Sequence, residues 1–182
     1  MALRTLFTIG HSTHSIEEFI GLLKAHRIEE IADVRSIPRS RHVPQFNTDV
    51  LGESSRSAGI HYAHIAKLGG RRPARKDSIN TGWRNASFRG YADYMATPAF
   101  TEGLEELIEI ARARRTAIMC AEAVPWRCHR SLIADAMKVK GWTVRDIVSS
   151  AAPKEHELTP FLKVVDGRLT YPAGDDAPRL FA

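Results

Sequence analysis

The stretch MCAEAVPWRCHRSLIAD, residues 119–135, marks a turn from a buried strand into a helix. Thr116 to Met119 have the apolar character of a buried parallel strand, and Pro125 suits the first turn of a helix, where its missing N–H costs nothing. We expect the helix to run from Pro125 to Lys140, because Gly141 would end it. A helix start presents unpaired N–H groups and a partial positive charge. The turn therefore predicts a site for an anion or a thiolate.

Outward from this turn, the chain alternates strands and amphipathic helices. Strands are expected at residues 5–9, 28–34, 60–65, 116–120 and 143–148, and helices at residues 15–25, 47–58, 88–95, 97–111 and 125–140. This alternation predicts an α/β fold with a Rossmann-like, doubly wound, mostly parallel sheet of about five strands. Residues 161–171 alternate around Asp166 and Gly167, which predicts a C-terminal β-hairpin. We expect a single α/β domain over residues 1–182, with its core over about residues 5–150 and the hairpin extension over about residues 153–182.

Composition narrows the class of protein. The 182 residues are 43% hydrophobic and 26% charged, which is enough to bury one sizeable core. No apolar run approaches the roughly 18 residues that span a bilayer, and no secretory signal opens the chain. We therefore expect a cytoplasmic protein without membrane contact. Its two cysteines, eight positions apart, are expected to be thiols rather than a disulfide framework.

Positive charge is concentrated in one window. Residues 35–89 hold eleven lysines and arginines against three acids, although the net charge of the whole chain is only +5. Histidine and aromatic residues are interleaved with these bases, the mixture that grips a nucleic-acid backbone and unstacked bases. The alternative is an ordinary solvated basic surface. The window favours nucleic acid or a nucleotide as the partner.

Reactive residue types follow several predicted strands. In a doubly wound sheet, ligands bind outside the carboxyl ends of the strands, where the strand order reverses. If the order is 3-2-1-4-5, that point lies between strands one and four, and His11 and Cys120 become neighbours. The residues that follow the strands are His11, Ser12, Asp33, Arg35, His64, Lys67, Cys120 and Glu122. This convergence predicts a functional site.

Several motifs together resemble the domain-of-unknown-function family numbered 488 (DUF488). The stretches are TIGHSTHSIEEF at 8–19, DVRSIPRSR at 33–41, LGGRR at 68–72, FRGYADYM at 88–95 and MCAEAVPWRCHR at 119–130. The resemblance covers about residues 5–150. It implies an α/β fold with a pocket built from these motifs, and it implies no established reaction.

The first hypothesis for the chemistry is a carboxylate site. Cleavage of a nucleobase–sugar bond needs a carboxylate that stabilises a cation-like sugar or activates water, which Glu122 would supply with help from His11 and Asp33. It also needs cations for the flanking phosphates. Those cations would be Arg35, Arg39, Arg41, Arg71 and Arg72. The alternative for Glu122 is a helix cap, or an ion pair with Arg127 or Arg130.

A second hypothesis is a nucleophilic thiolate. Cys120 at a strand end and Arg127 beyond it resemble the arrangement of cysteine-dependent phosphatases and sulfurtransferases. Six residues separate the two instead of the usual five, and Glu122 among them would repel a phosphate. The alternative is that Cys120 is a small buried hydrophobe.

A third hypothesis is a metal site. Cys120, Cys128, His129 and His11 are all ligand types that zinc accepts. The seven residues between the two cysteines do not match a strong paired motif, and a histidine such as His129, beside Arg130 on a helix, is more often a surface or helix-capping residue than a ligand. We therefore expect no cofactor, with zinc as the alternative. His26 and His156 are expected at the surface, because each has polar neighbours in the sequence.

The sequence as a whole favours a hydrolase that cleaves a nucleobase–sugar bond, in the manner of a DNA glycosylase with a role in DNA repair. The expected catalytic residues are Glu122, His11, Asp33 and Cys120. Those expected to bind substrate are Ser12, Arg35, Arg39, Arg41, Gly69, Gly70, Arg71, Arg127, Cys128, His129 and Arg130. A Cys120-dependent phosphatase or sulfurtransferase and a non-catalytic nucleic-acid-binding module are the alternatives. The kind of nucleic acid and the oligomeric state stay open.

Overall fold

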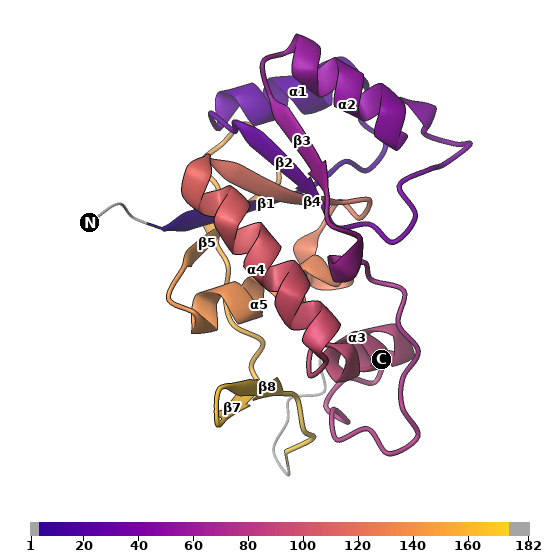
Figure 1. Cartoon of the computed structure of the whole chain (residues 1–182), viewed down its shortest axis with the longest axis vertical. Helices are drawn as coiled ribbons and strands as arrows, with labels where there is room; N and C mark the ends of the chain where they lie inside the picture. The colour runs from indigo at the N-terminus through magenta and orange to yellow at the C-terminus, as the bar shows by residue number, and fades with distance from the viewer. Residues whose placement is uncertain (1–3, 175–182) are drawn as a thin grey trace.

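A six-stranded sheet forms the centre of the computed structural model, which describes residues 4–174 (Figure 1). Its order is β3-β2-β4-β1-β5-β6, and all neighbours are parallel except the antiparallel pair β5 and β6. The strands are β1 (Thr5–Gly10), β2 (Glu30–Asp33), β3 (His61–His64), β4 (Thr116–Cys120), β5 (Thr143–Ile147) and β6 (Lys154–Glu155). The predicted α/β fold with a mostly parallel sheet is confirmed, and β6 is a short strand that the sequence pattern did not indicate.

Five α-helices connect the strands. They are α1 (Ile16–Ala25), α2 (Thr48–Ser57), α3 (Ala86–Tyr94), α4 (Pro98–Ala113) and α5 (Arg130–Val139). The N-termini of two helices agree with the sequence prediction: Ser15 and Glu18 form a capping box on α1, and Thr97 caps α4. Three single turns of 3-10 helix complete the set, η1 (Pro44–Phe46), η2 (Ala66–Leu68) and η3 (Pro125–Arg127).

The predicted start of the last helix is wrong. Pro125 opens only the η3 turn, and α5 begins at Arg130 with His129 in the N-cap position. Pro125 tolerates either kind of turn because it only fixes φ and lacks an N–H. The consequence is that Cys128 and His129 lie at the true helix start rather than inside a helix.

The predicted strand order is also wrong. Strand β4 lies between β2 and β1, instead of beyond β1 as the order 3-2-1-4-5 requires. The connection from β1 to β2 therefore skips one strand position in the sheet. This position is later occupied by β4. His11 and Cys120 are nevertheless neighbours, because β1 pairs with β4 and the His11 N–H donates to the Cys120 carbonyl at 2.9 Å.

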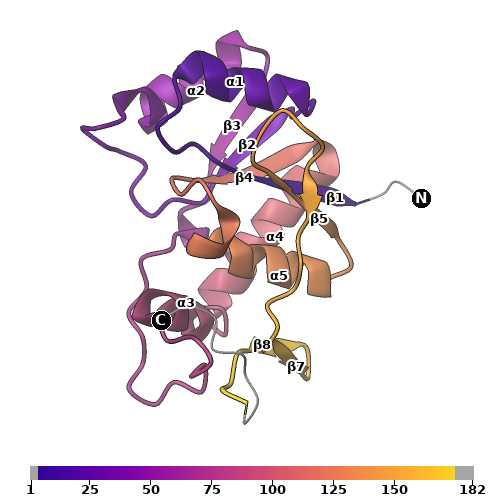
Figure 2. The same ribbon diagram turned by 180° about the vertical axis from the view of Figure 1, so that it is seen from behind.

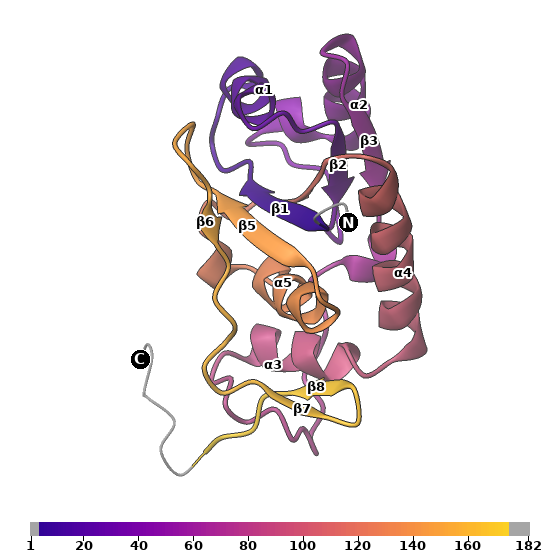
Figure 3. The same cartoon turned by 90° about the vertical axis from the view of Figure 1, so that its left-hand side faces the viewer.

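Helices cover both faces of the sheet. Figure 3 shows α1 and α2 on one side and α4 and α5 on the other. Successive side chains of a strand point to opposite faces of the sheet, so one strand contributes to both helix layers. On β1, Phe7 and Ile9 pack with α1 and α2, whereas Leu6 packs with α4 and α5. A strand buried on both faces reads as a continuous apolar run, which is how these strands appear in the sequence.

The C-terminal segment returns along α5 and ends in the predicted hairpin. β7 (Lys163–Val165) and β8 (Arg168–Thr170) pair around Asp166 and Gly167, both of which have positive φ (Figure 2). The side chain of Tyr171, just beyond, is buried in the main core. The extent of the single domain over residues 1–182 stays a prediction, because residues 1–3 and 175–182 lie outside the described part. Within residues 4–174, no helix has the length and apolarity needed to cross a membrane.

The expectation that His26 and His156 lie at the surface is wrong. Both are buried, at 8% and 6% exposed. Their polar neighbours in sequence do not determine their surroundings, since the ring of His26 meets the Ser149 carbonyl and that of His156 meets two carboxylates from other elements.

Candidate functional site

A pocket of about 280 Å³ lies at the carboxyl end of β4. Four segments that are distant in sequence form its wall: the loop after β2, the loop after η2, the start of α3 and the turn between β4 and α5. The lining residues are Arg35, Ser36, Ile37, Gly70, Arg71, Ser87, Phe88, Cys120, Ala121, Glu122, Arg127, Cys128 and His129.

The topology explains why the pocket opens at β4. The chain leaves β1 and β2, the two neighbours of β4, toward α1 and α2 on one face of the sheet. It leaves β4 toward α5 on the other face. Loops that diverge to opposite faces leave a crevice between them, and this crevice is the usual ligand position in such sheets.

Gly10 allows the turn after β4 to cross the end of β1. A Cβ built on Gly10 would lie 1.7 Å from the carbonyl oxygen of Glu122 and 3.0 Å from the Cα of Ala123. No side chain fits in that space. The backbone of Glu122 is therefore held against the sheet while its side chain is exposed at the pocket.

Arg130 fixes the same turn from the opposite side. Its guanidinium is fully buried and donates to the carbonyls of Glu122 and Ala123. Among residues 4–174, no carboxylate forms an ion pair with it. Arg130 does not line the pocket. It anchors the turn through these two hydrogen bonds, and its guanidinium is a buried positive charge behind the pocket.

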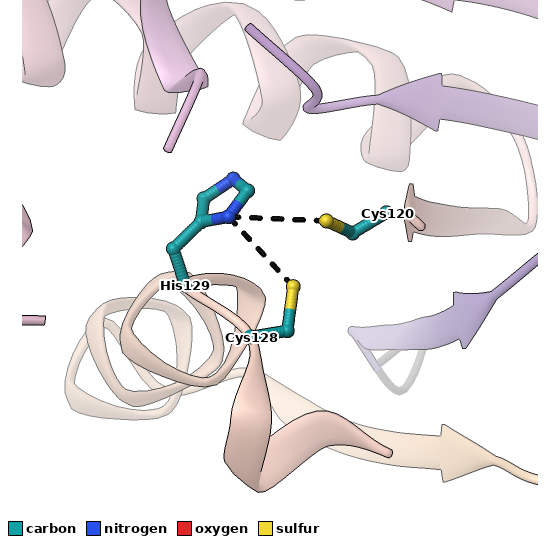
Figure 4. Close-up of side chains that lie close together, drawn as sticks. All are labelled: Cys120, Cys128 and His129. Atoms are coloured by element: carbon teal, nitrogen blue, oxygen red, sulfur yellow. Dashed lines mark hydrogen bonds between the residues drawn. The ribbon is translucent and has the colours of Figure 1, made fainter. Parts of the chain in front are cut away.

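Two thiols and an imidazole meet in the pocket wall (Figure 4). The Nδ1 atom of His129 lies 3.9 Å from the Cys120 sulfur and 3.7 Å from the Cys128 sulfur. The three atoms lie within 4.8 Å of one another. Cys120 comes from the last position of β4, and the other two come from the start of α5. Both cysteines are free thiols.

The surroundings shift the pKa values of the two thiols in opposite directions. The neighbouring Cys128 lowers the pKa of Cys120 well below its usual value, with burial opposing and His129 assisting. Burial, together with the neighbouring Cys120, raises the pKa of Cys128 well above its usual value. Of the two thiols, Cys120 is therefore the more acidic.

Backbone contacts orient the His129 ring. Its Nε2 atom lies 2.8 Å from the Val34 carbonyl, so Nε2 carries the proton and Nδ1 presents its lone pair to the sulfurs. Gly70 packs on the same ring: a Cβ there would lie 2.4 Å from Nδ1 and 2.7 Å from both Cγ and Cε1. A Cβ in line with the Nδ1 lone pair would be much farther from Cγ and Cε1 than from Nδ1. The three similar distances therefore place Gly70 against the flat face of the ring, out of line with the lone pair.

A buried ion pair lies beside this cluster. Arg35 binds Asp33 through Nε at 2.9 Å and Nη2 at 2.6 Å, and Tyr62 donates to the same carboxylate at 2.6 Å. Burial disfavours the charged guanidinium, but the bonds to Asp33 outweigh it and raise the pKa of Arg35. The positive charge of Arg35 is thus largely compensated before any ligand binds.

His11 is part of that buried pair rather than of the pocket surface. Its Nε2 faces Nη1 of Arg35 at 3.3 Å, its Nδ1 faces the Ser12 carbonyl at 2.9 Å, and its ring stacks on Phe46 with centroids 4.2 Å apart. Burial lowers the pKa of His11, which favours the neutral ring. Both ring nitrogens of His11 already have partners. The hypothesis that His11 joins Cys120, Cys128 and His129 as a metal ligand is therefore wrong.

Two arginines are available to a ligand. The guanidinium groups of Arg71 and Arg127 line the pocket, are exposed, and form no ion pair within the described part of the chain. Glu122 is likewise exposed at the pocket. The aromatic wall is Phe88, whose ring stacks on Trp83 with centroids 4.8 Å apart.

The structure brings together eight of the residues singled out in the sequence: Arg35, Gly70, Arg71, Cys120, Glu122, Arg127, Cys128 and His129. Asp33 and His11 lie behind the pocket wall. Ser12, Arg39, Arg41, Gly69 and Arg130 do not line it. Gly69 has a packing role, because a Cβ there would lie 2.7 Å from the Ser36 hydroxyl oxygen.

Sequence reasoning missed Ser36, Ile37, Ser87 and Ala121 as lining residues, and it did not choose Phe88 as a site residue. Ser36, Ile37 and Ala121 directly follow or adjoin residues that were chosen, so adjacency was an available signal. Phe88 belongs to the motif FRGYADYM, from which the resemblance implied a wall of the pocket, and Ser87 directly precedes this motif.

Comparison with known families supplies one match. The model of the family described as "Domain of unknown function DUF488" matches residues 15–137. The chain belongs to the DUF488 family. The matched region of this DUF488 protein contains every residue that lines the pocket, whereas His11 precedes it. No curated protein and no solved structure matches the chain.

Proposed function

We propose that this DUF488 protein is a hydrolase that cleaves the nucleobase–sugar bond of a nucleotide or nucleic acid, with Glu122 as its catalytic carboxylate. One observation supports this above others. A single pocket contains an exposed carboxylate, two arginines that form no ion pair within residues 4–174 and an aromatic ring. A nucleotide has the matching groups: a phosphate, a sugar that becomes cation-like during the reaction, and a flat base.

Each part of the pocket has a role in this reaction. Arg71 and Arg127 hold phosphate oxygens, and Phe88 packs against the base. Glu122 accepts a proton from water as the water attacks the anomeric carbon. The bond from that carbon to the base nitrogen breaks, and the base leaves with its electron pair and gains a proton. The products are the free base and a sugar that carries the hydroxyl.

The direct test is base release from oligonucleotides that carry modified bases, single- and double-stranded. We expect Glu122→Gln to lower the rate by about 100-fold or more, since a general base contributes at least that much. Glu105→Gln, an exposed acid on α4, is the matched control and should keep the full rate. Release that persists in Glu122→Gln would remove the carboxylate from the mechanism.

Binding strength against salt tests the cationic part of the site. The slope of log affinity against log salt changes by about 0.9 for each phosphate contact on duplex DNA, or about 0.7 on a single strand. Arg71→Gln and Arg127→Gln should each reduce the slope by about one such contact. A flat slope in the unsubstituted protein would exclude a nucleic acid, and steep binding without any turnover would indicate a binding module.

A second candidate function is thiolate-dependent transfer of a phosphoryl group or a sulfane sulfur. The specific observation is that Cys120 lines the pocket with an oriented imidazole 3.9 Å from its sulfur. In this reaction the sulfur attacks phosphorus or the donor sulfur, the bond to the leaving group breaks, and a covalent Cys120 adduct forms. Turnover would then be lost in Cys120→Ser and kept in Glu122→Gln.

We also propose that the protein acts in the cytoplasm. Both cysteines are free thiols that lie close together. A reducing compartment keeps such thiols available, whereas an oxidising one favours disulfides.

A further inference from the structure

We infer that Cys120, Cys128 and His129 bind one zinc ion, with a fourth coordination position open to the pocket (Figure 4). This site is independent of the proposed hydrolase, because the ion would bind whether or not a nucleotide is the substrate. Four properties of the cluster support it: the distances, the orientation of the imidazole, the charge behind the sulfurs and the position of the pocket.

The distances need only small changes to fit a metal. Zinc lies about 2.3 Å from sulfur and about 2.0–2.1 Å from nitrogen, so tetrahedral angles put a sulfur about 3.6 Å from the nitrogen. The observed distances from His129 Nδ1 are 3.9 Å to Cys120 and 3.7 Å to Cys128. Shifts of a few tenths of an ångström would fit these two distances. The two sulfurs, which lie within 4.8 Å of each other, would approach to about 3.8 Å around the metal.

The imidazole is held as a ligand, with its lone pair directed at the sulfurs. A ligating histidine usually donates its other N–H to a carbonyl or carboxylate, which fixes the tautomer and the ring plane. His129 does this through Nε2 and the Val34 carbonyl at 2.8 Å. Gly70 lies against the face of the ring and leaves the line of Nδ1 free. The sequence alternative, that His129 is only a helix cap, does not explain this: it occupies the N-cap position but forms no side-chain capping bond.

The start of α5 places positive charge near the Cys128 sulfur. The Arg130 backbone N–H lies 3.5 Å from this sulfur, and the buried Arg130 guanidinium lacks a carboxylate partner in the described structure. Cysteine binds a metal as the thiolate, and the thiol proton is released as the metal binds. Two thiolates and an imidazole form a ligand set that suits zinc and not magnesium or calcium.

The fourth position distinguishes this site from a purely structural one. All three ligand residues line the pocket, so water or an anionic ligand can reach the metal. Three protein ligands with one open position is the arrangement of catalytic zinc sites, in which a bound water is acidified. Glu122, two residues after Cys120 and exposed in the same pocket, is a carboxylate outside the ligand set.

The first experiment measures metal in the full-length protein, purified in the presence of a reductant. We expect one equivalent of zinc per chain. Replacement of zinc by cobalt(II) should produce a sulfur-to-cobalt charge-transfer band and the strong visible bands of a tetrahedral ion, since both sulfurs bind. This spectrum uses the unsubstituted protein, so it does not depend on the folding of any variant.

Variants then assign the ligands. Cys120→Ser, Cys128→Ser and His129→Gln should each lower the metal content well below one equivalent. His64→Gln is the matched control, because His64 also meets a backbone carbonyl through Nε2, that of Arg35 at 2.8 Å, but has no sulfur partner. It should keep the full equivalent.

Alkylation of the native protein distinguishes thiols that bind zinc from thiols that do not. With zinc bound, both thiols should resist iodoacetamide until a chelator is added. Absence of zinc, no cobalt–thiolate band and rapid alkylation of Cys120 would overturn the site and favour the thiolate transfer reaction. Loss of base release in Glu122→Gln, by contrast, concerns only the proposed hydrolase and leaves the metal measurement unaffected.

Discussion

Two histidines show how the same side chain serves different ends in this molecule. His129 uses one ring nitrogen on a backbone carbonyl and directs the other at two sulfurs in a pocket. His156 is buried, with Nε2 3.0 Å from Asp135 and Nδ1 3.4 Å from Asp146. The polar atoms of the second cluster all have partners at hydrogen-bonding distance, whereas the first cluster, in the wall of a pocket, has only long contacts of 3.9 and 3.7 Å between its imidazole and its sulfurs. A fully satisfied cluster stabilises the fold, and an incompletely satisfied one in a pocket is available to a ligand.

The His156 cluster attaches the C-terminal segment to the sheet layer. Asp135 on α5 also accepts from Thr159 and from the hydroxyl of Tyr171, at 2.7 and 3.0 Å. Asp146 on β5 also accepts from Thr8 on β1, at 2.6 Å. Four side chains, those of Thr8, His156, Thr159 and Tyr171, thus depend on two carboxylates. Removing either carboxylate should affect stability far more than removing any group in the pocket.

The largest effect is expected for Asp135→Ala. The change leaves the buried His156 with reduced compensation and the Tyr171 hydroxyl without its acceptor, so we expect the free energy of unfolding to fall by about 3–5 kcal/mol. Urea unfolding followed by circular dichroism measures it. Glu157→Ala, an exposed acid beside His156 in sequence, is the control and should change stability by less than about 0.5 kcal/mol. A loss below 1 kcal/mol in Asp135→Ala would contradict the structural role of the cluster.

The pH dependence of stability is the next effect. Burial opposes the charged form of His156, but the bonds and charges of Asp135 and Asp146 outweigh it and raise the pKa to about 9. Because this pKa exceeds the unfolded value of about 6.5, the stabilisation is complete below pH 6.5 and is lost as pH rises through 9. The loss should be on the order of 3 kcal/mol. Urea unfolding at several pH values should show it, and His156→Gln should flatten the curve over this window. An equal slope in both proteins would contradict the assignment.

A smaller effect is expected for Gly70→Ala, which tests the other cluster. The new Cβ would collide with the His129 ring, so we expect a loss of about 1–3 kcal/mol and a displaced imidazole. Zinc content should fall together with stability. Gly52→Ala on α2 is the matched control, because its Cβ would meet only Tyr62 at 3.8 Å; it should be neutral or stabilising by up to about 1 kcal/mol. Full zinc content in Gly70→Ala would show that the ring position is not critical.

The smallest effect on stability is expected for Arg127→Gln. The exposed guanidinium has no ion-pair partner in the described residues, so the free energy of unfolding should change by less than about 0.5 kcal/mol. Binding of an oligonucleotide should nevertheless weaken. Thermal unfolding and fluorescence anisotropy measure the two quantities on the same sample. A large loss of stability would place Arg127 with the structural groups instead of with the pocket.

Local features of the fold were predictable because local chemistry determines them. The Ser15 capping box, the Thr97 cap and the Asp166–Gly167 turn each depend on side chains and backbone angles within a few residues. The gathering of eight chosen residues at the pocket has the same origin in part, since reactive types after buried strands must gather at one edge of a parallel sheet.

The failures share a different cause. The position of β4 between β2 and β1 and the burial of His156 each depend on which elements pack together. The late start of α5 at Arg130 belongs with them, because the buried Arg130 holds the preceding turn by two carbonyls that only the folded sheet positions.

The sequence by itself therefore determined the α/β class, the helix caps, the hairpin and the residue types that gather at the strand ends, since these follow from periodicity and short-range bonding. Tertiary structure decided the strand order and the roles of individual side chains. Cys120, Cys128 and His129 became one cluster, and His11 was drawn into the Arg35 pair, because the free energy of packing and of satisfying buried polar groups depends on neighbours that are distant in the chain.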